Sequence, residues 1–280
     1  MIRTVLVVGS GIMGRGIATS YGAAGFHCTV LSRHPERVGG LRATGELPAE
    51  PPDLVIEAIP EDLRLKIDLF RRLDEAYGGR SILASNTSGL PLQEMADVLR
   101  HPEAFCGIHY FQPAERFDYA ELIEVAQTAP EVVASVIMAL GRTGKHAIHL
   151  RKPVIGALIN RLQHALLHEA GHLLDEGVVD VAAIDLVARN LLGPRMCVTG
   201  VLEQKDLTGL GTFAAVQREV VPHLNHSAEP TRTIQEVVAA GNDGIRSGRG
   251  FYDWRRRDVA DLQRRADEKL SRILEIVREP

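Results

Sequence analysis

The sequence predicts an α/β domain with a doubly wound parallel sheet over residues 1–150, followed by an all-helical domain over residues 151–280. Three observations support this. Up to about residue 150, short apolar runs alternate with segments of helical period, as in a parallel sheet with crossover helices. Beyond Lys152 the 3.6-residue period dominates and β-branched clusters are few. The first apolar run also ends in a glycine-rich turn that leads into a helix.

The first elements form a strand–helix–strand unit. Val5–Val8 is a short apolar run, as expected for a buried parallel strand. The helix that follows spans Met13–Ala24 and ends at Gly25, which is a favourable residue just beyond a helix. Phe26–Leu31 is the second strand.

The remaining elements of the first domain follow in the same alternation. We predict strands at 53–59, 81–88, 105–111, 120–126 and 146–150, and helices at 61–78, 92–99 and 128–145. In the second domain, the first long helix covers 160–180 and an amphipathic tail helix covers 261–279.

Composition excludes several classes of protein. The formal net charge is −4, so no basic footprint for nucleic acid is present. The three cysteines are scattered and contain no C-x-x-C, which favours a reducing compartment. The first residues lack the pattern of a secretory signal, and no apolar run approaches the roughly 18 residues of a membrane-spanning helix. We therefore expect a soluble cytoplasmic protein.

Gly9, Gly11 and Gly14 form G-x-G-x-x-G between a strand and a helix, the pattern of a Rossmann-type dinucleotide site. Gly9 allows the tight turn, Gly11 lets the backbone approach a pyrophosphate, and Gly14 lets the helix pack on the strand. The helix N-terminus offers N–H groups to the phosphates. We therefore also assign Ile12 and Met13 to the cofactor site.

The end of the second strand bears on which dinucleotide binds. A site for NAD usually has Asp or Glu there, which binds the ribose 2′-hydroxyl. This chain has Ser32 and Arg33 instead. Ser32 would not repel a 2′-phosphate, and the Arg33 guanidinium could pair with one. The expected cofactor is NADP or NAD, with NADP favoured.

Several motifs together resemble the 3-hydroxyacyl-CoA dehydrogenases and their relatives that act on carnitine or gulonate. The similarity covers nearly the whole chain. The matching segments are GSGIMGRGIA, DLVIEAIPEDLRLKIDLFRRLD, ASNTSGLP, GIHYFQPA, LIEV, INRLQHALLHEAGHLLDEGVV and GIRSGRGFYDW.

The resemblance implies a set of site residues. His109 corresponds to the catalytic histidine, which exchanges a proton with the substrate oxygen while hydride moves to or from the nicotinamide. Glu124 corresponds to the acid that orients this ring, although Glu121 competes for that role. Ser88 and Asn160 correspond to hydrogen-bonding groups around the reacting oxygen.

Two further positions, Glu61 and Lys66, correspond to residues near the cofactor. Asn86 and Thr87, by contrast, are interpreted as caps of the helix that follows them.

Three features bear on the substrate. Gln112 stands where the family usually has Asn. Residues 33–52 are too few for the helical hairpin that helps coenzyme-A-using members hold the coenzyme. The segment GPRMCVTG is closer to the carnitine and gulonate branch, and its Arg195 could bind a substrate carboxylate.

The pentapeptide His168–His172, HEAGH, also matches the H-E-x-x-H signature of zinc hydrolases. A zinc site needs a third ligand, and no H-x-x-G-x-x-H extension follows. The family resemblance places the segment in the first helix of the second domain. We therefore expect no metal.

The predicted function is hydride transfer between a nicotinamide cofactor and the β-carbon of a 3-hydroxyacyl or 3-keto substrate. The alternative substrate is a small free 3-hydroxy acid, carnitine- or gulonate-like, in place of a CoA thioester. A competing class is a non-catalytic nucleotide-binding protein. The expected partners are the small-molecule substrate and a second copy of the chain, with no nucleic acid and no membrane.

Overall fold

The structure, a computed structural model, describes residues 1–278. It consists of two compact units, Met1–Leu162 and Gln163–Pro280, and each is described by itself below. The division falls inside a helix, α5 (Ala157–Asp175), later than the expected boundary near residue 150.

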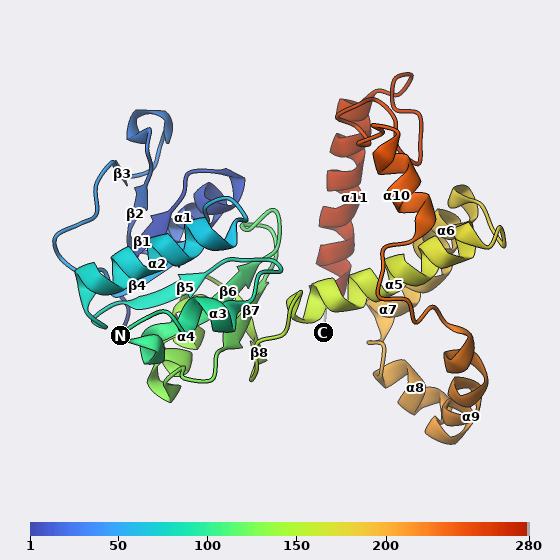
Figure 1. Cartoon of the computed structure of the whole chain (residues 1–280), viewed down its shortest axis with the longest axis horizontal. Helices are drawn as coiled ribbons and strands as arrows, with labels where there is room; N and C mark the ends of the chain where they lie inside the picture. The colour runs from blue at the N-terminus through green and yellow to red at the C-terminus, as the bar shows by residue number, and fades with distance from the viewer. Residues whose placement is uncertain (279–280) are drawn as a thin grey trace. The chain divides into compact units, whose positions relative to one another are not determined.

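The first unit contains an eight-stranded sheet in the order β3-β2-β1-β4-β5-β6-β7-β8 (Figure 1). Its strands are β1 (Thr4–Val8), β2 (His27–Leu31), β3 (Ala43–Thr44), β4 (Leu54–Glu57), β5 (Ile82–Ser85), β6 (Phe105–Tyr110), β7 (Tyr119–Glu124) and β8 (His146–Leu150). The strands expected from the sequence are all present, and β3 is an addition.

The sheet is parallel from β3 to β6, which confirms the expected fold class. One pair departs from a fully parallel sheet, since β6 and β7 are antiparallel. β8 returns parallel to β7. Because an eight-residue connection such as 111–118 is too short for a crossover, the two strands that it joins form a hairpin.

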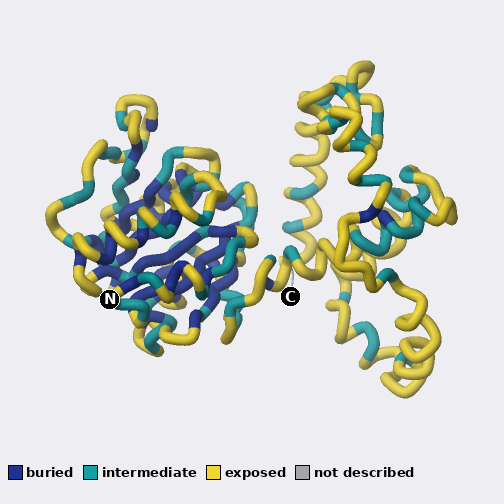
Figure 2. Tube along the Cα trace, in the orientation of Figure 1, coloured by how far each residue is buried: buried dark blue, intermediate teal, exposed yellow. Residues whose placement is uncertain are grey.

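Helices cover both faces of this sheet. Apolar side chains of α1 (Ile12–Ala23) and α4 (Pro130–Arg142) pack against one face. Those of α2 (Leu63–Tyr77) and α3 (Leu92–Ala96) pack against the other. Burial on both sides explains why β1 and β4 are continuous apolar runs. Figure 2 shows the buried residues concentrated in these strands.

α2 begins at Leu63, two residues after the expected start, and ends at Tyr77, one residue before the expected end. The Asp62 side chain accepts a hydrogen bond from the backbone N–H of Leu65 at 3.0 Å, which satisfies a free donor of the first turn. Gly78 ends the helix in the left-handed conformation, at φ 55°.

Residues 33–52 contain no α-helix, as expected. They form a short 3₁₀ turn, η1 (Pro35–Arg37), the two residues of β3 and irregular loops. The chain therefore has no helical hairpin between β2 and β4.

The second unit is helical. Beyond α5 it contains α6 (Val181–Val187), a π-helical turn η3 (Ala188–Leu192), α7 (Gly193–Val198), α8 (Glu203–Thr208), α9 (Leu210–Val220), α10 (Arg232–Ala239) and α11 (Val259–Arg278). The expected tail helix corresponds to α11, and its last predicted residue, 279, lies outside the described residues.

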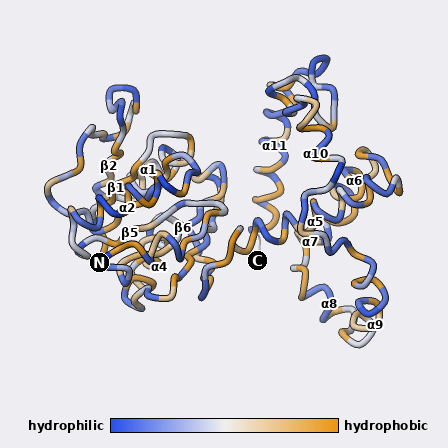
Figure 3. The backbone as a smooth tube through the Cα atoms, viewed as in Figure 1, coloured by the Kyte–Doolittle hydropathy of each residue, from blue (hydrophilic) through white to orange (hydrophobic). Residues whose placement is uncertain are grey.

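This unit has almost no core of its own. Among residues 163–278 only Gly171 and Thr231 are buried. Figure 3 shows hydrophobic stretches along helices of this unit that Figure 2 colours as exposed. In residues 1–278 no helix is both long and apolar enough to cross a membrane.

Candidate active site

The C-terminal ends of four neighbouring parallel strands form one edge of the first unit. Gly9 follows β1, and a Cβ built at Gly9 would lie 2.5 Å from the carbonyl oxygen of Ala58, which follows β4. The backbone of Asn86, after β5, donates to the Glu57 carbonyl at 3.0 Å. The Asn86 side chain accepts from Tyr110 at the end of β6, at 2.9 Å. The strand order reverses at β1 and β4, so this edge is where a doubly wound sheet binds its ligand.

The glycine turn has the form that a dinucleotide requires. Gly9 has a φ of 116°, which an L side chain rarely adopts. A Cβ at Gly14 would lie 2.0 Å from the Gly9 carbonyl oxygen, so only glycine permits this helix–strand contact. A Cβ at Gly11 would meet nothing within 4 Å. No side chain caps α1 at Gly11, so the N–H groups of the first turn, including those of Ile12 and Met13, have no capping side chain and suit a phosphate.

The end of β2 carries no carboxylate. The Ser32 hydroxyl lies 2.8 Å from the Ser10 hydroxyl and accepts a hydrogen bond from the His34 backbone at 3.1 Å. Ser32 is buried and Arg33 is exposed. This arrangement leaves the end of β2 without a negative charge, and the residue that follows Ser32 is an exposed arginine.

The predicted catalytic histidine is paired with a carboxylate. His109 lies on β6, directly across the antiparallel register from Glu121 on β7. Its Nδ1 lies 2.7 Å from Glu121 Oε2. Both groups are buried, with 5 % of His109 and none of Glu121 exposed. His109 is therefore paired with a carboxylate, that of Glu121, which was only the competitor of Glu124 in the sequence.

Glu124 is not the partner of His109, and that prediction is wrong. Side chains alternate between the two faces of a strand, so residues three apart point to opposite faces. Glu124 lies across from Cys106 and bonds His149 Nε2. Spacing alone does not separate the two acids, because the register of the hairpin decides which of them faces His109.

Glu121 also connects the histidine to α5. Its Oε1 accepts hydrogen bonds from the backbone N–H groups of Leu158 and Ile159, at 2.8 and 3.0 Å. These groups belong to the first turn of the helix, where a carboxylate is favoured by unpaired donors and by the helix dipole.

Asn160 lies in the same turn, and its amide donates to the Ser88 carbonyl at 2.9 Å. The structure therefore brings Asn160 together with Ser88, and links this first turn of α5 to the His109–Glu121 pair. All of these residues belong to the first unit.

The charge of Glu121 is maintained by its hydrogen bonds. Burial acts to raise the pKa of this carboxyl group, but the bonds from His109, Ile159 and Leu158 outweigh burial, and the pKa lies below its usual value. An ionised carboxylate only accepts hydrogen bonds. His109 Nδ1 therefore carries the proton toward Glu121, and Nε2 is free to exchange a proton with another group.

Glu61 and Lys66, predicted to lie near the cofactor, belong to a buried ionic network. Lys66 Nζ lies 2.5 Å from Glu57 Oε1 and 3.2 Å from Glu61 Oε2, and Lys66 is 1 % exposed. Glu61 Oε1 accepts from the Thr87 hydroxyl at 2.6 Å and from the Ser88 backbone at 2.9 Å.

This network was not predicted from the sequence. Glu57 at the end of β4 is fully buried, and its Oε2 accepts from the Ser85 hydroxyl at 2.6 Å. The ionic pairs therefore hold the loop that carries Ser88 to the end of β4. Asn86 and Thr87, interpreted from the sequence as helix caps, instead bind β6 and Glu61.

The HEAGH segment lies on α5 in the second unit. His168 Nε2 lies 2.9 Å from the Ser227 carbonyl oxygen, and Glu169 accepts from the Asn225 backbone at 2.8 Å. These contacts attach the loop before α10 to the helix. Within residues 1–278, no group of three or more His, Cys, Asp or Glu side chains is placed to hold a metal ion. Arg195 is exposed on α7 of the same unit.

Comparison with known protein families gives two matches that together span most of the chain. Residues 48–153 match the family described as 3-hydroxyacyl-CoA dehydrogenase, NAD binding domain. Residues 156–254 match 3-hydroxyacyl-CoA dehydrogenase, C-terminal domain.

Individual relatives extend over the full length. The 5-formyl-3-hydroxy-2-methylpyridine 4-carboxylate 5-dehydrogenase of Mesorhizobium japonicum is 28% identical, over 99% of both chains. A probable 3-hydroxybutyryl-CoA dehydrogenase of Bacillus subtilis is 31% identical, over 90% of this chain and 98% of its own. Among solved structures, a 5-formyl-3-hydroxy-2-methylpyridine 4-carboxylic acid 5-dehydrogenase, described as an NAD⁺-dependent dismutase, superposes with a TM-score of 0.92. It is 27% identical, over 100% of this chain and 99% of that one.

Proposed function

The chain belongs to the 3-hydroxyacyl-CoA dehydrogenase family, and we propose that its reaction depends on His109 and Glu121 as the proton-exchanging pair. As a member of this family it is an oxidoreductase that acts on a CH–OH group and uses NAD. It transfers hydride between that cofactor and the β-carbon of a 3-hydroxyacyl or 3-keto substrate. The observation that carries the proposal is the 2.7 Å contact between His109 Nδ1 and Glu121 Oε2.

The chain's own groups account for the proton. In the oxidation direction, His109 Nε2 accepts the hydroxyl proton while Nδ1–H remains bonded to Glu121. The imidazolium that forms is stabilised by the buried carboxylate, which keeps its charge through the donors of α5. When bound, the nicotinamide would supply the hydride acceptor, and in the reduction direction His109 Nε2–H would return the proton to the substrate oxygen.

The first turn of α5 connects Ser88 and Asn160 to this pair, because its backbone binds Glu121 and its Asn160 side chain binds Ser88. We assign the Ser88 hydroxyl to the reacting oxygen of the substrate, where a donor stabilises developing negative charge. The Asn160 amide already donates to the Ser88 carbonyl, so Asn160 would hold the Ser88 loop against the first turn of α5.

The test of this function is His109→Gln. Gln retains a polar amide but cannot exchange a proton near neutral pH, so kcat should fall by about 100-fold or more. Binding of NAD, measured by quenching of protein fluorescence or by calorimetry, should be unchanged because the glycine turn is intact. Wild-type turnover in His109→Gln would refute the assignment of the base.

A second candidate concerns the form of the substrate. We propose a small free carboxylic acid in preference to a CoA thioester. Residues 33–52 contain no helix that could contact a coenzyme. The relative from Mesorhizobium japonicum, whose alignment covers 99% of this chain and 99% of its own, is named for a pyridine carboxylate.

Substrate form is tested by NADH oxidation with acetoacetyl-CoA, free 3-keto acids and 5-formyl-3-hydroxy-2-methylpyridine 4-carboxylate. We expect a higher kcat/KM with a free acid. A higher value with acetoacetyl-CoA would reject the free-acid proposal and leave the family reaction intact.

We also propose that the site accepts NADP at least as well as NAD. Ser32 carries no charge, and Arg33 is exposed beside it. Ser32→Asp would place a carboxylate where a 2′-phosphate would lie, while an Asp could still accept from Ser10. We expect kcat/KM with NADPH to fall by about tenfold relative to NADH, which corresponds to about 1.4 kcal/mol. A wild-type enzyme at least tenfold better with NADH would overturn this proposal.

The partner of the second unit is proposed to be a second copy of the chain. This unit exposes large apolar side chains, such as Leu166 on α5 at 51% and Leu202 just before α8 at 77%. Self-complementary twofold contacts are the commonest way in which such surfaces are covered. A cytoplasmic location is proposed from the cysteines, since Cys28, Cys106 and Cys197 are all free.

A further inference from the structure

A second buried lysine contacts the loop of the β6–β7 hairpin and takes no part in the ionic network of Lys66. Lys145 lies in the turn between α4 and β8, next to Gly144, which has a φ of 77°. Only 5% of Lys145 is exposed. Its ammonium group donates to the carbonyl oxygens of Ala114 and Phe117, both at 2.6 Å.

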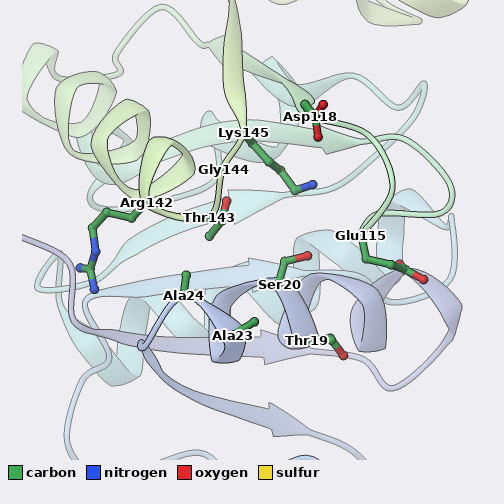
Figure 4. Close-up of a pocket in the computed structure, with 10 residues that line it drawn as sticks. All are labelled: Thr19, Ser20, Ala23, Ala24, Glu115, Asp118, Arg142, Thr143, Gly144 and Lys145. Carbon is green, nitrogen blue, oxygen red and sulfur yellow. The ribbon is translucent and has the colours of Figure 1, made fainter. Parts of the chain in front are cut away.

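These two carbonyl groups belong to the loop that joins β6 to β7. The loop, residues 111–118, begins two residues after His109. Figure 4 shows the Lys145 side chain beside the loop segment that carries Glu115 and Asp118. A cavity of about 400 Å³ adjoins it, lined by residues of α1, of the loop and of the turn after α4. A buried ammonium requires partners, and two backbone carbonyls supply them here.

The loop reaches the catalytic ring through two aromatic side chains. The Phe117 ring packs edge-to-face on the Phe111 ring, with centroids 6.2 Å apart. The Phe111 ring packs edge-to-face on the His109 imidazole at 5.3 Å. The contacts therefore run from Lys145 through the Phe117 backbone to the two rings and to His109.

We propose that Lys145 is a positioning residue that fixes the 111–118 loop and, through Phe117 and Phe111, the orientation of the His109 ring. Glu121 controls the imidazole through Nδ1, and Phe111 limits rotation of the ring plane. The proposal rests on the proposed role of His109, because a loop without a reacting histidine would have nothing to orient.

The loop itself provides a test that needs no substrate. Trypsin cleaves after arginine, and Arg116 lies between the two carbonyls that Lys145 binds. Lys145→Met removes the ammonium while keeping the length of the side chain. We expect cleavage at the 116–117 bond to become about tenfold faster in this variant. The rate is measured by mass spectrometry of the fragment that begins at Phe117.

Lys269→Met is the matched control. Lys269 is an exposed lysine on α11, and its substitution should leave cleavage at 116–117 at the wild-type rate. Lys145→Arg retains donors for both carbonyls and should restore part of the protection. Equal protection in wild type and Lys145→Met would overturn the proposal.

Kinetics test the second half of the proposal. In Lys145→Met we expect kcat to fall by about tenfold, since small misplacements of a reacting group are costly, while KM for the nicotinamide cofactor stays unchanged. Phe117→Leu keeps Lys145 and its backbone partners. This variant therefore tests the link to His109 even if Lys145→Met does not fold. It should lower kcat without faster cleavage at Arg116. A wild-type kcat in Phe117→Leu would refute the link to His109.

The readouts also separate this proposal from the proposed function. Faster cleavage of Lys145→Met, with no turnover of any hydroxy or keto substrate by the wild type, would support the loop contact and reject the dehydrogenase assignment.

Discussion

Glu121 and Glu124 lie three residues apart on one strand, and their surroundings differ completely. Glu121 is fully buried and accepts hydrogen bonds from His109 and from the first turn of α5. Glu124 bonds His149, and its side chain remains 26% exposed. The alternation of side chains along β7 separates the two carboxylates onto opposite faces of the sheet.

The pair of glutamates supplies its own control. Glu121→Gln removes the charge that stabilises the imidazolium, so we expect kcat to fall by about 100-fold. Glu124→Gln changes the same chemical group on the other face and should leave kcat close to the wild-type value. Both are measured by steady-state NADH formation. A larger loss for Glu124→Gln would show that the wrong carboxylate has been assigned.

Glu121 also makes stability depend on pH. Its pKa in the folded protein lies below the ordinary value of 4.5, because its hydrogen bonds outweigh the effect of burial. A carboxyl group with a lowered pKa contributes stability that is present above its unfolded pKa and lost as pH falls through the folded value. Urea unfolding between about pH 6 and about pH 3 should therefore show a shallower loss of stability in Glu121→Gln than in wild type.

The quantity compared is the slope of the unfolding free energy against pH in the two proteins. A slope is needed because other carboxyl groups such as Glu61 also have lowered pKa values and titrate in both proteins. Parallel curves for wild type and Glu121→Gln would mean that Glu121 is not preferentially ionised in the folded state.

At the scale of the elements, the first turn of α5 organises the site. Its backbone donors bind Glu121, and Asn160 binds the loop after β5. Asparagine is a poor residue inside a helix, but here its amide forms a contact that a good helix former could not. One helix end therefore connects the acid on β7 with the loop after β5.

Removal of the Asn160 amide should affect catalysis more than helix stability. We expect Asn160→Ala to lower kcat by about tenfold, because Ser88 loses its fixed position relative to α5. Asn190→Ala is the control, since the Asn190 amide donates to a carbonyl within its own helical segment, that of Leu186, at 2.9 Å, and not to the loop after β5. The two variants are compared by kcat and by thermal midpoint. A similar fall in kcat for both would assign the effect to general destabilisation.

At the scale of the whole molecule, the two units differ in how they are stabilised. The first unit buries two apolar clusters on either side of its sheet. The second buries only Gly171 and Thr231 among residues 163–278. A helical unit that exposes so much apolar surface needs another surface to cover it.

Leu166→Glu tests the second copy as that partner. Leu166 on α5 is 51% exposed, and a charge there would oppose burial in an interface. Sedimentation velocity should show a dimer for wild type and a shift toward monomer for Leu166→Glu. Gln163→Glu, an exposed polar position on the same helix, should remain dimeric. A monomeric wild type at micromolar concentration would contradict the proposal.

Much of the first unit was predictable because its signals are local. The glycine turn, the apolar strands and the end of α2 at Gly78 depend on conformational limits of nearby residues. Among the site residues, His109, Ser88 and Asn160 followed from the family resemblance, and the structure links them through Glu121 and α5. Glu57 gave no such signal, since a buried acid at the end of an apolar strand is recognisable only by its partner Lys66.

The amino-acid sequence by itself determined the fold class and the dinucleotide turn, and it pointed to His109 as the proton-exchanging histidine that we propose. Only the tertiary structure decided which carboxylate pairs with that histidine, because the register between β6 and β7 selects the face on which each carboxylate lies. It likewise decided that the backbone of α5 binds Glu121 and that Lys145 binds the loop after His109. Such contacts join residues far apart in the chain, and no local pattern encodes them.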